Sequence, residues 1–376
     1  MSMKKILFRK LLFDYLSFFI IALLGSSIVV WVFQAVNYLD IMIEDGRDYT
    51  IYINYSLLNF PKILSKLFPF VLFFSIFHIT TKIENNNELI ILWNFGVTKI
   101  ELINFIFKFS LLLMIVQLIL SSLIIPKSQD MARSFLRTST VNFFGNFIKP
   151  QRFNDTIKNV TIYSEKKDND GNLYNLYLKK QLDKNDFQIT YAKKGIFKEF
   201  NKIPVLVLYE GATITGKNDK ITNFSFSKSD FALKDFKSNA TTYKKTQELS
   251  SFKLLKCLYL LEFEKEKKEI NIENCSKKNL QNIYKELYKR FLIPFYIPLL
   301  VLIPFLLLLS SKENTNYSKL KSITFSIGLI FIIFSETTIK LISTTHHENI
   351  TISLMPFLFL ISLYLFFFKK TNFKAI

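Results

Sequence analysis

The chain has 376 residues and a formal net charge of +19, and 50% of its residues are hydrophobic, including 41 phenylalanines. The apolar residues form unbroken blocks of about 20, the length of a membrane-spanning helix, which excludes an ordinary soluble protein. The positive charge accompanies abundant Lys, Asn, Ile and Phe and no nucleic-acid-binding motif, so no nucleic-acid partner is expected.

Six apolar blocks predict six transmembrane helices. Prolines inside the second and fourth blocks predict kinks rather than breaks because neighbouring helices can satisfy the freed backbone groups. The first block follows a basic N-terminus but is too long for a signal peptide and has no cleavage site, so we expect it to remain as a helix. The six blocks cover residues 11–36, 57–79, 100–125, 291–309, 323–342 and 350–368.

Lysine and arginine in the short segments between blocks predict the orientation. The N-terminal tail, the 312–321 link and the C-terminal tail are basic. The opposite links, residues 40–48 and 343–349, hold acidic residues, with Arg47 as their single basic residue. We therefore expect both termini in the cytoplasm and the long segment between the third and fourth helices outside.

That external segment is expected to be β up to about residue 250. Stretches such as VTIYSEK and IPVLVLYEGATITG alternate apolar with polar residues, and DNDG and GKNDK separate them as turns. Five or more strands in meander order predict an antiparallel sandwich or roll with an open edge. Residues 251–290 read as amphipathic helices, in which Cys257 and Cys275 could form a disulfide or remain as two thiols.

No motif predicts a catalytic, cofactor or metal site. GATITGKN, residues 211–218, matches the first seven positions of a phosphate-binding loop, but Asn replaces the final Ser or Thr and a strand follows, which favours a hairpin turn. His78, His346 and His347 have no Cys or carboxylate cluster beside them. We therefore expect no enzyme activity and no cofactor.

A short apolar segment, about residues 85–96, separates the second and third helices. The asparagines at 85–87 offer N-caps, Glu88 stands in the first turn, and Gly96 suits the helix end. Thr98 and Glu101 form a capping box for the third membrane helix. One face of the short helix can contact the bundle, and the other needs a partner unless it lies on lipid. The apolar residues are Leu89, Ile90, Ile91, Leu92, Trp93 and Phe95.

Four stretches in this order resemble the permeases of the lipopolysaccharide transport (Lpt) exporter, the YjgP/YjgQ family, over essentially the whole chain. NELIILWNFG is similar to the family's S/N-E-L-x6-G pattern after the second helix. FPKILSKLFPF, IPKSQDMARSFLR and YKELYKRFLIPFYIPLL are similar to the start of its second helix, the end of its third and the start of its fourth.

The resemblance implies an α-helical integral membrane protein with an inserted periplasmic antiparallel β-jellyroll. Residues 1–125 would hold helices one to three, 126–250 the jellyroll, 251–290 an amphipathic connector and 291–376 helices four to six. It also implies a multi-pass protein of the bacterial inner membrane that pairs with a paralogous permease subunit. Gln34 and the sequence ELYKR favour the F-type subunit over the G-type.

The resemblance further implies that a separate dimeric ATPase docks on the short helix and drives lipopolysaccharide toward a periplasmic bridge of similar jellyrolls. The coupling residues would be Glu88, Leu89, Ile90, Leu92, Trp93 and Gly96. Basic residues near the outer end of the family's first helix contact lipid, and here Arg47 is the single base of that region. Candidate lipid-path residues are Gln34, Asn37, Arg47, Val205, Val207 and Tyr209.

Two alternatives remain open at this stage. One is a mechanotransmitting ABC permease that moves no lipid, a class that usually has four helices. The other is a membrane-anchored sensor with an external β domain, which would need no apolar cytoplasmic helix. The number of helices tests the first alternative, and co-purification of an ATPase tests the second.

Overall fold

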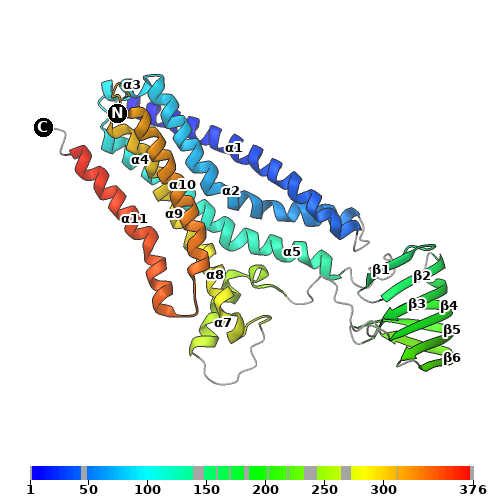
Figure 1. Ribbon diagram of the computed structural model, residues 1–376. Coiled ribbons are helices and arrows are strands. Elements are labelled where there is room, and N and C mark those ends of the chain that lie inside the picture. The colour runs from blue at the N-terminus through cyan, green and yellow to red at the C-terminus, as the bar shows by residue number, and fades with distance from the viewer. Residues whose placement is uncertain are drawn as a thin grey trace. The chain divides into compact units, whose positions relative to one another are not determined.

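The computed structural model divides into two compact units, each described here by itself (Figure 1). The helical unit comprises Met1–Phe33, Leu58–Asp130 and Tyr243–Ile376, and the second unit comprises Gln34–Leu57 and Met131–Thr242. The structure describes residues 2–43, 49–138, 148–157, 160–168, 171–181, 186–200, 203–217, 220–232, 244–263, 272–310 and 312–372. Arg47, one of the candidate lipid-path residues, lies outside them.

Six helices of the described chain are long and apolar enough to cross a membrane, which confirms the six predicted spans. They cover Met3–Leu39, Tyr49–Asn85, Lys99–Phe135, Lys277–Leu309, Tyr317–Leu341 and His347–Thr371. Their elements are α1 (Ser2–Ile43), α2 (Tyr49–Asn85), α4 (Lys99–Ile119), α5 (Ile125–Thr138), α8 (Leu280–Phe291), α9 (Tyr296–Leu302), α10 (Tyr317–Leu341) and α11 (His346–Asn372). The count differs from the four helices usual in the alternative permease class.

Proline positions explain how two of these helices deviate from regular geometry. In the fourth span, Pro294 and Pro304 each lie in a 3-10 segment, η4 (Ile293–Phe295) and η5 (Ile303–Leu309), so the prolines bend the helix without ending it. In the third span, a π-helical turn, η1 (Leu120–Ile124), joins α4 to α5 immediately before Pro126. The helix therefore continues to Thr138, and the expected start of the β domain at residue 126 is wrong.

Close helix packing in the helical unit depends on one glycine. A Cβ atom added to Gly328 of α10 would lie 2.0 Å from Cζ of Phe73 on α2, whose side chain is fully buried. Small residues allow this approach between membrane helices, where dispersion contacts replace the hydrophobic effect as the source of stability. Phe73 and Phe77 then contact α9 and α10 in one buried cluster.

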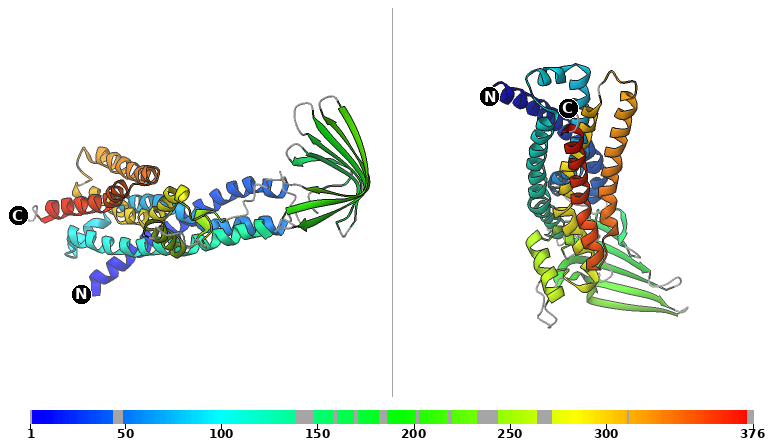
Figure 2. Two further views of the ribbon diagram at one scale, coloured as in Figure 1. Left: turned by 90° about the horizontal axis from the view of Figure 1, so that it is seen from below. Right: turned by 90° about the vertical axis from the view of Figure 1, so that its left-hand side faces the viewer.

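The second unit contains one six-stranded antiparallel sheet in the order β1-β2-β3-β4-β5-β6, which confirms the predicted meander. The sheet is strongly curved (Figure 2). Leucines of β3 and β5 and Ala192 of β4 form its buried apolar cluster. The strands are β1 (Phe153–Ile157), β2 (Val160–Lys167), β3 (Leu173–Gln181), β4 (Phe187–Phe200), β5 (Ile203–Lys217) and β6 (Lys220–Ala232).

A row of irregular positions crosses the sheet and changes which residues face the cluster. Asn175 and Glu210 have positive φ angles of 49° and 51°, and the strand pairing skips both of them. On β3, Leu176 and Leu178 are buried two residues apart, but the next buried residue, Leu173, lies three residues before Leu176. Simple alternation therefore holds only on either side of this row.

The predicted amphipathic connector consists of α7 (Ser251–Phe263) and α8, preceded by η2 (Thr246–Glu248) and η3 (Lys277–Asn279) respectively. Cys257 of α7 is fully buried and forms a disulfide with Cys275. Leu254, Ile283 and Leu287 complete the apolar cluster around this bond. The disulfide resolves the choice between bonded and free thiols that the sequence left open.

Candidate functional site

The short helix α3 (Glu88–Asn94) connects α2 to α4, as the sequence predicts. Leu92 is 4% exposed in the main core cluster of the helical unit, and Leu89 and Trp93 contact the same cluster. Ile90, Ile91 and Phe95 are 52%, 49% and 43% exposed. The helix thus covers the bundle with one face and presents an apolar patch of three residues on the other; this patch is called the α3 patch below.

Glycine ends α3, and a capping box starts the next helix. Gly96 has a φ of +71°, its N–H donates to the Trp93 carbonyl at 2.9 Å, and the Val97 N–H donates to the Leu92 carbonyl at 3.1 Å. This pair of bonds is the Schellman arrangement, which favours glycine at the left-handed position. Both bonds of the box between Thr98 and Glu101 are present. Together they set the angle at which α3 leaves the bundle.

The expectation that an asparagine side chain caps α3 is wrong. Asn87 occupies the N-cap position with a φ of 62°, and its side chain makes no capping hydrogen bond. Asn86 instead donates to Oε1 of Glu88 at 3.1 Å. This bond leaves Glu88 half-buried beside the α3 patch.

Polar contacts hold both ends of α3 to neighbouring helices. Nζ of Lys4 on α1 donates to the Gly96 carbonyl at 2.8 Å and lies 3.1 Å from a Glu101 oxygen. Before α3, the Tyr317 hydroxyl donates to Glu84 Oε2 at 2.5 Å. Motion of α3 is therefore tied to α1 at its end and to α10 at its start, which the sequence did not predict.

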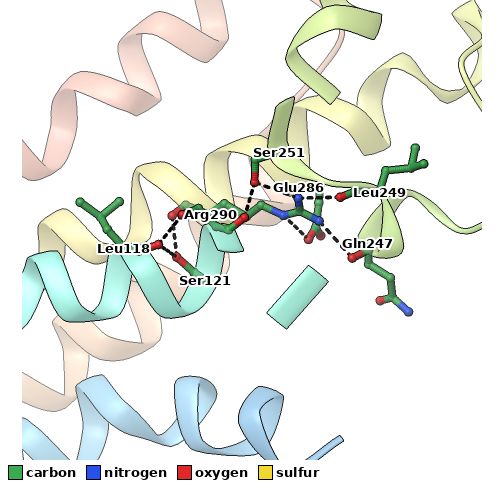
Figure 3. Close-up of polar contacts among 8 residues, drawn as sticks. Leu118, Ser121, Gln247, Leu249, Ser251, Glu286 and Arg290 are labelled. Carbon is green, nitrogen blue, oxygen red and sulfur yellow. Dashed lines mark hydrogen bonds and ion pairs between the residues drawn. The ribbon is translucent and has the colours of Figure 1, made fainter. Parts of the chain in front are cut away.

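A buried arginine fixes the segment that leads into α7 (Figure 3). Arg290 of α8 is 2% exposed; its Nε donates to Glu286 Oε1 at 3.0 Å, and Nη1 donates to the Leu249 carbonyl at 2.8 Å. Nη1 also donates to Ser251 Oγ at 3.1 Å, and Nη2 donates to the Gln247 carbonyl at 3.0 Å. Such a forked set of bonds needs the planar guanidinium.

Ser251 extends this network to the third span. Its hydroxyl donates to the Ser122 carbonyl at 2.6 Å. Pro126 has no N–H to offer that carbonyl, so Ser251 satisfies an acceptor that the proline leaves free. Ser121 in turn donates to the Arg290 carbonyl at 2.8 Å. The Arg290 network therefore joins three chain segments and stabilises the irregular turn before Pro126.

The candidate lipid-path residues lie in two separate places. On α1, Gln34 accepts a hydrogen bond from the Tyr38 hydroxyl at 3.1 Å, and Asn37 is exposed. On β5, Val207 is buried while Val205 and Tyr209 are half-buried. The apolar cluster of the sheet contains the alternate residues of that strand, Leu206 and Leu208. The predicted trio therefore shares one strand face, but the opposite face carries the cluster.

Within the part of the chain that the structure describes, no group of three His, Cys, Asp or Glu side chains could hold a metal ion. His78 lies beside aromatic side chains instead, stacked on Phe18 with ring centroids 4.8 Å apart.

The chain is similar to a protein of known sequence and to a protein family. A protein of Rickettsia prowazekii (strain Madrid E), named uncharacterized protein RP871, is 25% identical over 208 residues. That match covers 55% of this chain and 57% of the relative, so the chain spans little more than half of that protein's length. Residues 9–370 match the family described as lipopolysaccharide export system permease LptF/LptG. Because this match covers nearly the whole sequence, the chain belongs to the LptF/LptG family of lipopolysaccharide export system permeases.

Proposed function

We propose that this chain is the F-type member of a pair of paralogous permease subunits, and that a dimeric cytoplasmic ATPase drives it to move lipopolysaccharide out of the inner membrane. The F-type assignment rests on Gln34 and on the sequence ELYKR at 286–290. The observation that carries the proposal is the α3 patch, because three exposed apolar side chains on an anchored helix require a protein or lipid neighbour.

The ATPase docks on the α3 patch, with Glu88 facing a basic group at the rim of the partner's groove. A helix laid in an apolar groove is a common mode of recognition, and a charge at its rim sets orientation. When the ATPase closes, α3 moves, and the Tyr317–Glu84 bond transfers that motion to α10. Glu88, Leu89, Ile90, Leu92, Trp93 and Gly96 are the proposed coupling residues.

In this proposal both termini and α3 lie in the cytoplasm, and the sheet lies in the periplasm. Lysines near the N-terminus and in the 312–321 link support the orientation. The Cys257–Cys275 disulfide supports it independently, because disulfides form outside the cytoplasm.

The curved sheet receives the acyl chains of the lipid in this proposal. On β5 the apolar cluster of the sheet contains Leu206 and Leu208. We therefore propose that the lipid contacts the face of these two leucines. The opposite face, with Val205, Val207 and Tyr209, is no longer the proposed path. The bridge proteins, with similar jellyrolls, extend the sheet at β6, which is an edge strand of the sheet among the described residues, by main-chain pairing. Ile221 and Phe224 of that strand are 74% and 69% exposed.

Charge reversal at Glu88 tests the coupling assignment. The Glu88→Lys variant should insert normally but retain its ATPase weakly on purification, with lipopolysaccharide export reduced, because it places like charges together. Glu88→Gln should have a smaller effect. Glu348→Lys, at the other end of the bundle, serves as the matched reversal and should behave as the wild type. Normal ATPase retention and export by Glu88→Lys would show that α3 is not the docking helix.

Photo-crosslinkers at neighbouring positions of β5 test the lipid path. Because Val207 and Leu208 point to opposite faces of one strand, they form a matched pair. Capture of lipopolysaccharide that needs ATP and occurs at Leu208 but not Val207 is expected in the assembled transporter, and moderate salt should change it little. Equal capture at both positions without ATP would indicate nonspecific contact with the basic surface.

A further inference from the structure

The helix α7 carries apolar side chains on two opposite faces. One face packs on α8 (Figure 1), with Leu254 and the fully buried Cys257 in the apolar cluster around the disulfide. Phe252, Leu255 and Tyr259 belong to the other face and are 76%, 47% and 58% exposed. They are three and then four residues apart, which places them on one side of a helix. This side is called the α7 face below.

Two exposed lysines border the α7 face along one edge. With 3.6 residues per turn, Lys256 lies about 40° and Lys253 about 100° around the helix axis from Phe252. An apolar face beside lysines is typical of a helix that lies in a membrane interface, because the lysine stem covers apolar surface while its ammonium group stays in water. The position of α7 relative to the bilayer decides whether lipid is the neighbour of this face.

The first turn of α7 lies at the level where the third span leaves the hydrocarbon. Ser251 Oγ donates to the Ser122 carbonyl at 2.6 Å, so the two residues share one depth. Ser122 is about 23 residues beyond Lys99, the first residue of α4, and a rise of 1.5 Å per residue makes that separation roughly 34 Å. The hydrocarbon core of a bilayer is about 30 Å thick, and the whole bilayer about 40–45 Å. Phe252 therefore lies near the boundary between hydrocarbon and headgroups, at the membrane face opposite α3.

The third span carries an apolar stripe that reaches the same point. Its exposed side chains recur every three or four residues, and an exposed apolar stripe on a span faces hydrocarbon or another membrane helix. The stripe ends at Leu123, which follows Ser122, while Phe252 follows Ser251. The hydrogen bond between the two serines thus connects the end of the stripe to the start of the α7 face. The stripe includes Leu112, Ile115, Ile119 and Leu123.

Along its length α7 moves away from the hydrocarbon. Near its start, Ser251 accepts a hydrogen bond from Arg290 Nη1 at 3.1 Å, and near its end Glu262 accepts one from the Tyr284 hydroxyl. About 16 Å of α7 therefore corresponds to about 9 Å of α8, so the two helices cross obliquely. The first turn of the α7 face lies nearest the hydrocarbon, and Tyr259 lies at the headgroup level, where tyrosines are enriched in membrane proteins.

The geometry points to α7 as an interfacial helix, whose α7 face inserts into the lipid layer at the membrane face opposite α3. Its neighbour is the bilayer itself, through acyl chains beside the headgroups, and Phe252 and Leu255 enter deepest. The disulfide and the Arg290 network hold α7 against α8 and so keep the inserted face at a constant depth. This role uses none of the proposed coupling or lipid-path residues and needs no ATPase, so it stands independently of the export mechanism.

Tryptophan fluorescence of the purified full chain in lipid vesicles tests the insertion. In a background with Trp31→Phe and Trp93→Phe, a single tryptophan is introduced by Phe252→Trp or by the matched neighbour Lys253→Trp. The vesicles are phosphatidylcholine, with or without bromine on the acyl chains, and iodide is the quencher in water on both sides. Bromine should quench Phe252→Trp strongly and shift its emission to shorter wavelength than that of Lys253→Trp. Iodide should quench Lys253→Trp more than Phe252→Trp.

The two quenchers separate the possible neighbours of the α7 face. Leu123→Trp, at the 64% exposed end of the stripe, is the positive control and should be quenched by bromine, and thermal unfolding shows that each variant is folded. Iodide quenching without bromine quenching of Phe252→Trp would place the face in water and overturn the proposal. Protection from both quenchers would show that a protein surface, such as a second copy, covers the face, which also overturns it. Equal bromine quenching at 252 and 253 would contradict insertion by one face.

Discussion

The hydroxyl of Tyr317 donates a 2.5 Å hydrogen bond to Oε2 of Glu84, joining the first residue of α10 to the end of α2. Both residues are buried, at 8% and 7% exposure. Nζ of Lys312 also donates to the Asn85 carbonyl, at 3.3 Å. These two hydrogen bonds connect the segment just before α3 to α10 and to the link that precedes it. Through them, a movement of α3 would be transmitted to the membrane helices.

Removal of the Tyr317 hydroxyl should weaken this connection. Tyr317→Phe leaves a buried carboxylate oxygen without its donor, so we expect a loss of about 1–3 kcal/mol of stability, measured by thermal unfolding in detergent. In the assembled transporter, ATP hydrolysis should continue while lipopolysaccharide release falls. Tyr364→Phe removes a hydroxyl that donates to Asn104 at 2.9 Å and serves as the control, with export unchanged. Wild-type stability and export in Tyr317→Phe would contradict this role of the connection.

The sequence revealed local features better than contacts between distant segments. Hydrophobic blocks of spanning length and the glycine at 96 specify helices and a helix end through nearby residues alone. The Tyr317–Glu84 bond joins residues 233 positions apart, and the Arg290–Leu249 bond crosses 41 positions. Periodicity contains no information about such pairs.

The sheet shows a second limit of pattern reasoning. Alternation places Val205, Val207 and Tyr209 on one face, but it does not say which face is apolar in three dimensions. The irregular positions at Asn175 and Glu210 shift the alternation along the strands, and ordinary polar residues occupy them. The third span likewise continued through Pro126 because the Ser251 hydroxyl, far along the chain, satisfies the Ser122 carbonyl.

Replacement of Gly328 by alanine should destabilise the bundle despite alanine's better helix propensity. The new Cβ would overlap the Phe73 ring, and overpacking of this kind costs about 1–3 kcal/mol. Gly25→Ala is the control, because no atom lies within 4 Å of its added Cβ, so it should be neutral or stabilising. Thermal unfolding of the wild type, Gly328→Ala, Phe73→Leu and the double variant forms a double-mutant cycle, which measures the interaction between the two positions. The smaller residue at 73 should rescue Gly328→Ala, and additive losses would contradict the overlap.

Arg290 should tolerate no substitution well, including lysine. Arg290→Met leaves Glu286 and the carbonyls of Gln247 and Leu249 without their donor, and removal of one member of a buried charged pair costs about 3–5 kcal/mol. Arg290→Lys restores charge but not the forked geometry, so it should recover only part of the loss. Limited trypsin digestion should cut faster at Lys253 in both variants, whereas Lys285→Met should match the wild type. Full recovery by lysine would show that charge alone matters.

The disulfide gives a test of stability and of orientation together. Closing the loop between Cys257 and Cys275 should stabilise the chain by about 3 kcal/mol, so Cys275→Ala should lower the unfolding temperature. In denatured membranes prepared from cells with free thiols blocked, a maleimide reagent should label the wild type only after reduction. The double variant Cys257→Ala/Cys275→Ala should never be labelled, which controls for other reactive groups. Because the cytoplasm keeps thiols reduced, cysteines on that side would be blocked from the start, so absence of labelling in the wild type even after reduction would place α7 on the cytoplasmic side and contradict the proposed orientation of the sheet as well.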